Sequence, residues 1–253
     1  MPNVRPDDRR PVGDHPGPEG RQGRSVKSGQ PVSAEVTALL SGGGAVCRTW
    51  SEQDEGPYHR EDQPSRREIT EDRNGLPLGL GLSLGTADGT LLRGGVVEIW
   101  HCDASGRYSG FPPPNPSVVA TLATAPRGMY LAGQTFLRGS QITDQAGIVE
   151  FRTIYPGWYP GRTVHIHVIV RAVGRVFTSQ LYFPDAATDE VLRRPPYSER
   201  LERDTTNATD EIFSTGGEPA LLDLTPSDNA YLAAACLRLP LDAASHEGTE
   251  FDP

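Results

Sequence analysis

Hydrophobic residues in this chain of 253 amino acids gather in short segments that glycine and proline separate. Within a segment, apolar residues alternate with small or polar ones, as between Leu78 and Leu84, which is typical of a strand with one buried face. Short strands at this spacing predict a mainly β fold, an antiparallel β-sandwich with long loops. The predicted strands cover residues 76–86, 95–102, 147–155, 163–170, 176–183 and 230–239.

The start of the chain departs from this pattern. Residues 1–32 are rich in Pro, Gly, Arg, Asp and Ser, so they cannot bury enough apolar surface to fold, and we expect a disordered tail. A short helix is predicted from Ser33 to Leu40, with Ser33 as its N-cap and a run of three glycines at its end. Residues 33–253 then form one β-sandwich domain, in which the polar segment after Phe183 makes long connections.

Composition and charge exclude several classes of partner. The 36% of hydrophobic residues suffice for a core, and a net charge of -9 argues against a nucleic-acid binder, which carries a basic surface. No apolar run approaches the roughly 20 residues of a membrane helix, so we expect no membrane partner either. The polar N-terminus lacks an apolar signal core, which favours a cytoplasmic location; the alternative is secretion, with the signal absent from this chain.

The cysteines constrain the chemistry only weakly. Cys47, Cys102 and Cys236 form no CxxC pair and are too few for a thiolate zinc site or a disulfide scaffold. One disulfide is compatible with them, and Cys47 with Cys102 is the pair we favour. Three buried, reduced thiols fit the sequence equally well.

Two histidines stand out in the run of β-branched residues from Val164 to Val170. Residues two apart in a strand share a face, so His165 and His167 point one way while Ile166 and its apolar neighbours point the other. A pair of this kind is a metal site or a structural pair with about equal frequency. The surrounding motifs must decide.

Three motifs extend the histidine pattern along the chain. They are WHCDASGRY from Trp100 to Tyr108, IYPGWYPGRTVHIH from Ile154 to His167, and QLYF from Gln180 to Phe183. In order and spacing they resemble those of the intradiol ring-cleavage dioxygenases, non-haem ferric enzymes that include the catechol and protocatechuate types. The resemblance spans about residues 45 to 215.

This resemblance implies one non-haem Fe(III) per chain with four protein ligands. The implied ligands are Tyr108, Tyr159, His165 and His167. In that family the phenolate matching Tyr108 stays on the metal when substrate binds, and the phenolate matching Tyr159 leaves it and accepts a substrate proton. Imidazole also suits zinc and copper, whereas a phenolate is a hard anionic oxygen donor suited to ferric iron.

The resemblance also assigns residues to the substrate. Arg162 and Gln180 match an arginine and a glutamine beside the substrate ring, where a fixed positive charge would stabilise carbanion-like character. We expect the pocket walls to include Tyr58, Trp158, Phe111 and residues 127–130. Outside the site we place Tyr155 in packing, Asp103 in a turn that accepts backbone N–H groups, and His59 in solvent.

We therefore expect an enzyme of aromatic catabolism. It would cleave a catechol-type ring between the two hydroxyl-bearing carbons, with both atoms of O2 inserted, to give a muconate-type diacid. One alternative is a non-catalytic transthyretin-like or carbohydrate-binding β-sandwich module; another is a zinc hydrolase using His165, His167 and Asp103. The sequence leaves the particular catechol open, and a homodimer is the default assembly.

Overall fold

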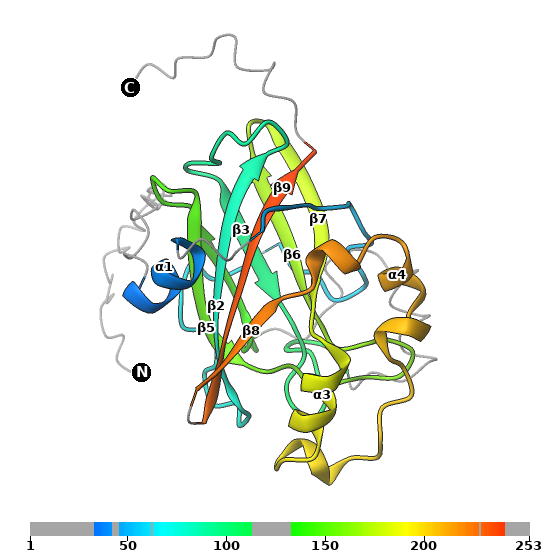
Figure 1. Cartoon of the computed structure of the whole chain (residues 1–253). Coiled ribbons are helices and arrows are strands. Elements are labelled where there is room, and N and C mark those ends of the chain that lie inside the picture. Colours follow the sequence, from blue (N-terminus) through cyan, green and yellow to red (C-terminus); the bar gives the residue numbers. More distant parts are fainter. Residues whose placement is uncertain (1–32, 42–45, 62, 113–132, 228, 241–253) are drawn as a thin grey trace, which may run out of the picture.

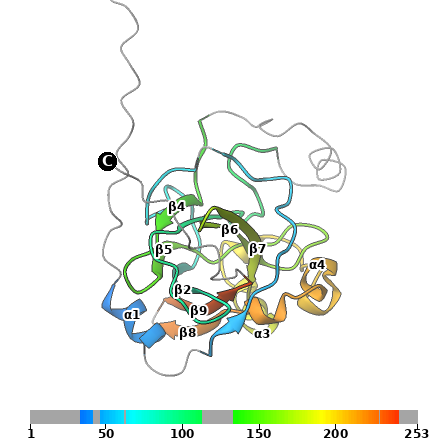
Figure 2. The ribbon, with the colours of Figure 1, turned by 90° about the horizontal axis from the view of Figure 1, so that it is seen from above.

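The computed structural model describes residues 33–41, 46–61, 63–112, 133–227 and 229–240. Two β-sheets pack face to face, with helices and long loops around them (Figures 1 and 2). The mainly β class with few helices is confirmed. The predicted tail and the 127–130 part of the predicted pocket wall lie outside the described residues.

One sheet carries the two histidines. Its order is β4-β3-β6-β7, and all three strand pairs are antiparallel. The strands are β3 (Val96–Trp100), β4 (Arg138–Ile142), β6 (His165–Ala172) and β7 (Arg175–Tyr182). Ile166, Val168 and Val170 point into the core between the sheets. The alternation read from the sequence is confirmed, so His165 and His167 lie on the outer face of this sheet.

The second sheet has the order β1-β9-β2-β5, with β8 paired to β9. The strands are β1 (Arg48–Thr49), β2 (Pro77–Thr86), β5 (Ile148–Ile154), β8 (Asp223–Ser227) and β9 (Ala230–Leu239). The pairs β2–β5 and β8–β9 are antiparallel, but β9 runs parallel to both β2 and β1, so the predicted antiparallel pairing does not hold for these two pairs. Apolar alternation has the same form in either strand direction, and the sequence pattern therefore could not reveal this.

Helix α1 (Ala34–Ser41) covers the outer face of the second sheet, where it packs against β2 and β9. The Ser33 hydroxyl accepts from the N–H of Val36 at 3.4 Å, which agrees with its predicted role as N-cap. The helix approaches β2 closely at Gly81, where an added Cβ would lie 2.3 Å from Val36 Cγ1. Figure 2 shows α1 and α4 on opposite sides of the sandwich.

A disulfide joins Cys47 to Cys236, 189 residues further along the chain. The pair favoured from the sequence, Cys47 with Cys102, is therefore wrong. Parallel pairing of Arg48 with Leu237 sets Cys47 beside Cys236, whereas Cys102 follows β3 in the other sheet. The Cys102 thiol is buried and donates to the Gly157 carbonyl at 3.2 Å.

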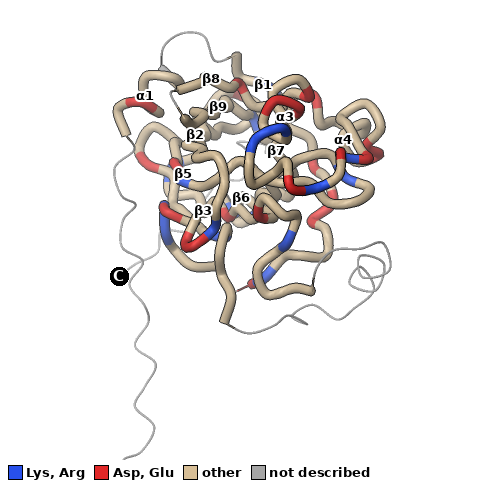
Figure 3. The backbone as a smooth tube through the Cα atoms, turned by 90° about the horizontal axis from the view of Figure 1, so that it is seen from below, with Lys and Arg blue, Asp and Glu red and all other residues tan. Residues whose placement is uncertain are grey.

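The long connection after β7 contains short helices. They are α3 (Asp185–Leu192), η1 (Tyr197–Glu199), η2 (Asn207–Thr209), α4 (Glu211–Ser214) and η3 (Glu218–Ala220). In the described part of the chain, acidic and basic positions are interspersed along the loops (Figure 3). No helix within those residues is long and apolar enough to cross a membrane.

Candidate metal centre

Four side chains meet on the outer face of the histidine-bearing sheet. The Tyr159 hydroxyl lies 3.2 Å from His165 Nε2, and the two histidine Nε2 atoms lie 3.0 Å apart. His167 Nε2 lies 3.1 Å from the Tyr108 hydroxyl. All four side chains are buried. Two nitrogen and two oxygen donors from three segments of the chain thus converge on one point.

A tight turn after β3 places Tyr108. The Asp103 carboxylate accepts from the backbone N–H groups of Ser105 and Arg107 at 2.9 and 3.0 Å, and Gly106 takes a left-handed conformation with φ of 82°. Asp103 is therefore a structural residue of the turn, as the sequence predicted. Its carboxylate is engaged and does not join the cluster.

The loop that carries Tyr159 packs backbone to backbone against this turn. A Cβ on Gly157 would lie 2.5 Å from the Ala104 carbonyl oxygen and 2.6 Å from that of Asp103. A Cβ on Gly106 would lie 2.3 Å from the Trp158 carbonyl oxygen. Because both positions are glycine, the two tyrosine-bearing loops come close enough for their phenols to meet.

The two imidazoles are held in different ways. His165 Nδ1 lies 2.6 Å from the Thr163 carbonyl, so it donates there and leaves the Nε2 lone pair facing the centre. The His167 ring stacks on Trp100, with centroids 4.9 Å apart and planes within 2° of parallel. His167 Nδ1 is buried without a hydrogen-bond partner among the described residues. Both Nε2 atoms are thereby directed at the cluster.

Burial keeps these four groups neutral while no cation is bound. It raises the pKa of the Tyr159 phenol to about 12 and that of Tyr108 well above its ordinary value of 10. Burial, helped by the charge of Arg162, lowers the pKa of His165 to about 3, and burial also lowers that of His167. A phenolate here would need a nearby positive charge to compensate it.

The donor set fits an oxidised metal ion. Two donors bound at right angles, each about 2.1 Å from an ion, lie about 3.0 Å apart, which matches the observed spacing. Within the described residues, no group of three or more His, Cys, Asp or Glu side chains is placed to hold a metal. A site here would therefore depend on its two phenols, and phenolates suit a ferric ion better than zinc. The zinc hydrolase alternative lacks its third ligand because Asp103 is engaged elsewhere.

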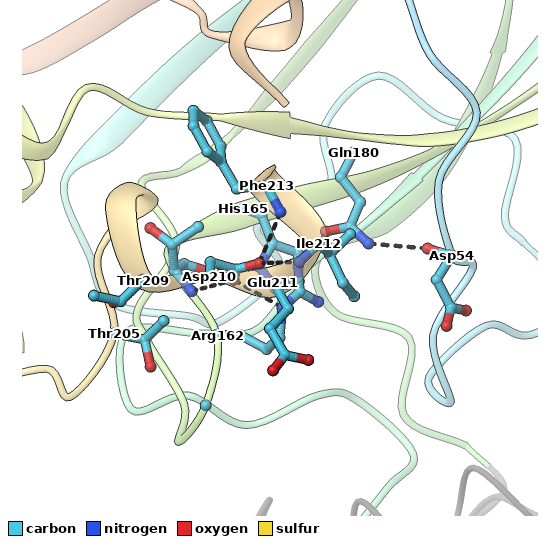
Figure 4. A network of polar contacts seen from close by, with 12 residues as sticks. Asp54, Arg162, His165, Gln180, Thr205, Thr209, Asp210, Glu211, Ile212 and Phe213 are labelled. Atoms are coloured by element: carbon cyan, nitrogen blue, oxygen red, sulfur yellow. Dashed lines mark hydrogen bonds and ion pairs between the residues drawn. The ribbon is translucent and has the colours of Figure 1, made fainter. Parts of the chain in front are cut away.

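A polar network runs along one side of the cluster (Figure 4). Arg162 donates from Nε to the Asp210 carboxylate at 2.9 Å and from Nη2 to the Gln180 side-chain oxygen at 2.6 Å. Gln180 in turn donates to the Asp54 carbonyl at 2.9 Å. Arg162 and Gln180 are thus brought together, as the sequence predicted. The sequence reasoning missed Asp210, whose only local signal is that of a helix N-cap before Glu211.

Of the three residues predicted to line the pocket, two adjoin the tyrosine ligands. Tyr58 stacks on Tyr108 with centroids 4.1 Å apart, and Phe111 meets Tyr58 edge-on at 5.3 Å. The Tyr58 hydroxyl is buried without a partner among the described residues. Trp158 lies apart from them: it packs in the main core, and the Arg200 guanidinium covers its ring at 4.3 Å.

His59 is not solvated, contrary to the prediction. Its ring nitrogens lie 3.2 Å from carboxylates of Glu55 and Glu98, and its ring centroid lies 4.9 Å from that of Trp100. Burial lowers the pKa of His59, but these hydrogen bonds outweigh burial and raise it above its ordinary value. Its polar sequence neighbours suggested solvent, whereas Glu55 is in fact its partner.

Several known proteins are similar to this chain. The model of a family described as dioxygenase matches residues 54–196. A chlorocatechol 1,2-dioxygenase of Cupriavidus pinatubonensis is 29% identical over 144 residues, 54% of this chain and 56% of that protein. The chain therefore spans about half the length of the curated relatives it matches.

Two solved structures extend the similarity over more of the chain. An intradiol ring-cleavage dioxygenase from Tetranychus urticae is 32% identical with a TM-score of 0.67, covering 78% of this chain and 96% of that one. The dioxygenase domain of a dioxygenase carbohydrate-binding protein fusion from Streptomyces sp. SirexAA-E is 28% identical, with a TM-score of 0.54. That match covers 76% of this chain and 97% of the other.

Proposed function

Because this chain belongs to the intradiol ring-cleavage dioxygenase family, we propose that it cleaves a catechol-type ring between the two hydroxyl-bearing carbons. Both atoms of O2 would enter the product, a muconate-type diacid. The observation that carries the proposal is the convergence of two phenols and two imidazoles within 3.0 to 3.2 Å. A non-catalytic β-sandwich module would have no use for four such donors.

Four residues would hold one non-haem ferric ion: Tyr108, Tyr159, His165 and His167. When bound, the ion supplies Lewis acidity and redox chemistry that prepare a chelated catechol for reaction with dioxygen. Two phenolates would offset two of its three positive charges, which lets the buried phenols ionise despite their raised pKa values.

The two tyrosines differ in how firmly they are held. Tyr108 is stacked against Tyr58 and follows a turn fixed by Asp103. Tyr159 begins a turn closed by the Arg162 N–H, which donates to its carbonyl at 3.3 Å, and its ring meets those of Tyr58 and Tyr108 edge-on, at 5.9 and 5.6 Å. We assign to Tyr159 the role of the phenolate that moves away and accepts a catechol proton.

Arg162 would stabilise negative charge on the substrate ring. Its guanidinium is largely buried, with 14% of the side chain exposed, so its charge acts through little water. The Gln180 side-chain oxygen holds one edge of the guanidinium in place by accepting from Nη2 at 2.6 Å. The Tyr58 hydroxyl, which has no hydrogen-bond partner among the described residues, and the Phe111 ring would form a wall against the substrate. A polar group of the substrate would then satisfy that hydroxyl.

For the compartment, the disulfide favours a different answer from the one that the N-terminus favoured. A bond between Cys47 and Cys236 favours an oxidising environment, because cytosolic thiols are kept reduced. We therefore favour the secreted alternative. The homodimer stays a prediction, and the choice among catechols is open to the assay that follows.

The proposal is tested on purified protein loaded with ferric iron. We expect one iron per chain, a wine-red colour from phenolate-to-iron charge transfer, and uptake of one O2 per ring when a panel of catechols is supplied. Tyr108→Phe should shift or bleach the colour and abolish turnover. Tyr155→Phe is the matched control, since that buried phenol bonds to Thr188 at 2.8 Å, away from the cluster. A colourless protein holding stoichiometric zinc, or Tyr108→Phe with full colour and rate, would refute the assignment.

A further inference from the structure

Residues 161–163, between Tyr159 and His165, all form hydrogen bonds to the same distant segment, residues 204–210. The Asp204 carboxylate accepts from the Gly161 N–H at 3.1 Å. The Asp210 carboxylate binds Arg162, and the Asn207 side-chain oxygen accepts from the Thr163 hydroxyl at 2.7 Å. We call residues 204–210 the clasp. It fixes the backbone that links one proposed ligand to the next.

Asp210 is the centre of the clasp. Its Oδ2 accepts from Arg162 Nε at 2.9 Å and from the Thr163 N–H at 2.7 Å, while its Oδ1 accepts from the N–H groups of Ile212 and Phe213 at 2.8 and 2.9 Å (Figure 4). The side chain has no exposed surface. Burial alone would raise its pKa, but Arg162 and the backbone N–H groups lower it below the ordinary value. The carboxylate is therefore charged, and its hydrogen bonds are the strong, charge-assisted kind.

Two routes lead from Asp210 to the cluster. The first route is the hydrogen bond to Arg162 Nε, which fixes the direction of the guanidinium so that its Nη2 donates to the Gln180 side-chain oxygen. Through the Thr163 N–H, Asp210 fixes the residue whose carbonyl orients His165 at 2.6 Å. The clasp lies beyond residues 54–196, the part of the chain that matches the family model.

We propose that Asp210 is a positioning residue for the ring-cleavage reaction, acting on Arg162 and on the Thr163–His165 unit. This inference rests on the proposed function. Without the carboxylate, Arg162 keeps its charge but loses the partner that directs it. A reactive group displaced by about 1 Å can cost about 100-fold in rate, so we expect kcat to fall 10- to 100-fold while KM changes less than threefold.

The test compares two substitutions at Asp210 with one elsewhere. Asp210→Asn keeps the size but has one carbonyl oxygen, so one of its two pairs of N–H donors loses its acceptor. Asp210→Ser keeps an N-cap for α4 yet is too short to reach Arg162. Asp144→Asn is the control, because that carboxylate also accepts backbone N–H groups, in the turn between β4 and β5. Iron content, the visible spectrum, kcat and KM are measured for each.

A second readout needs no activity. In metal-free protein the Arg162 Nε–H is shielded by Asp210, so its NMR signal should exchange slowly with water; Arg162→Lys identifies the signal by its absence. We expect the signal to broaden in both Asp210 variants and to persist in Asp144→Asn. In the Arg162→Lys background, adding Asp210→Asn should lower kcat by a smaller factor than in the wild-type background, since the route through Arg162 is already lost and only the route through Thr163 remains.

The outcomes separate the inference from the function on which it rests. If the wild-type protein cleaves no catechol, the proposed function fails, and the NMR signal alone decides whether Asp210 directs Arg162. If the wild-type is active, an iron-loaded Asp210 variant with kcat within twofold of Asp144→Asn would overturn the positioning role. If neither Asp210 variant folds, the positioning role is overturned as well, and Asp210 has a purely structural role.

Discussion

Removal of the Cys47–Cys236 disulfide should destabilise the protein strongly. We consider the double variant Cys47→Ser with Cys236→Ala, which opens a covalent loop whose ends are 189 residues apart. In the chain-entropy treatment, a disulfide that closes a loop of that length lowers the entropy of the unfolded chain, which raises the free energy of unfolding by about 5 kcal/mol at 25 °C. Disulfides commonly stabilise proteins by about 2–4 kcal/mol, so we expect the free energy of unfolding to fall by an amount in that range.

The folded state offers little to replace this bond. Strand β1 has two residues, and the next link to β9 is the Trp50 N–H, which donates to the Arg238 carbonyl at 2.8 Å. Trp50 is buried and packs against Phe177 at 5.3 Å, so the segment after Cys47 should stay in place. The loss is therefore expected in the free energy of global unfolding, and a loss of about 3 kcal/mol lowers Tm by about 10 °C in a domain of this size.

The assay is urea unfolding of metal-free protein, so that bound iron does not mask the difference. The oxidised wild-type, the reduced wild-type and the double variant are compared, with Cys102→Ala as control for a thiol outside the bridge. Titration of thiols in unfolded, unreduced protein should find one per chain in the wild-type and none in Cys102→Ala. Three thiols, or a double variant within 1 kcal/mol of the oxidised protein, would refute the reasoning.

Three further outcomes are expected. Gly157→Ala sets a Cβ 2.5 Å from the Ala104 carbonyl, so it should cost about 2 kcal/mol in urea unfolding and weaken iron binding, whereas Gly95→Ala, whose nearest atom lies 3.3 Å away, should do neither. The raised pKa of His59 contributes stability that is complete below pH 6.5 and is lost as the pH rises through the raised value. His59→Gln should remove that part of the pH dependence of the urea midpoint, and an unchanged pH profile would exclude the ion pairs as its cause. Chelation of the proposed ferric ion should bleach the protein and lower Tm, since an ion held by residues that meet only in the folded chain stabilises that state; an unchanged Tm would contradict a metal site built by the fold.

Local patterns in the sequence were enough for six of the strands in the described residues and for part of the site, whereas β1, β4 and β8 were not predicted. The alternation around His165 and His167 fixes their common face because a strand has a two-residue period. The start of α1 follows from Ser33 for a similar reason, since a cap acts within one turn of helix. Six strands were placed from such patterns, each within two residues at either end.

Features that depend on distant residues were not predictable in this way. The partner of Cys47 is set by the direction of β9, which no local pattern records. The carboxylate of Asp210 meets Arg162 across 48 residues, and His59 meets Glu98 across 39. Each of these contacts forms only in the folded chain, between residues far apart in the sequence. In the sequence, Asp210 and His59 therefore look like ordinary surface residues.

The position of β9 has a consequence for how the protein is made. This strand is the last in the described chain, yet it lies between β1 and β2 in its sheet. The strands that carry His165 and His167 leave the ribosome tens of residues earlier, by Tyr182, and need no later strand to complete their own sheet. In the opposing sheet, one edge of β2 stays unpaired until residues 230–239 have left the ribosome. An unpaired apolar edge strand is prone to aggregation. A nascent chain stalled before Ala230 would thus hold all four proposed ligands and the sheet that carries the histidines, but only the β2–β5 pair of the opposing sheet, and we expect chaperones to bind it.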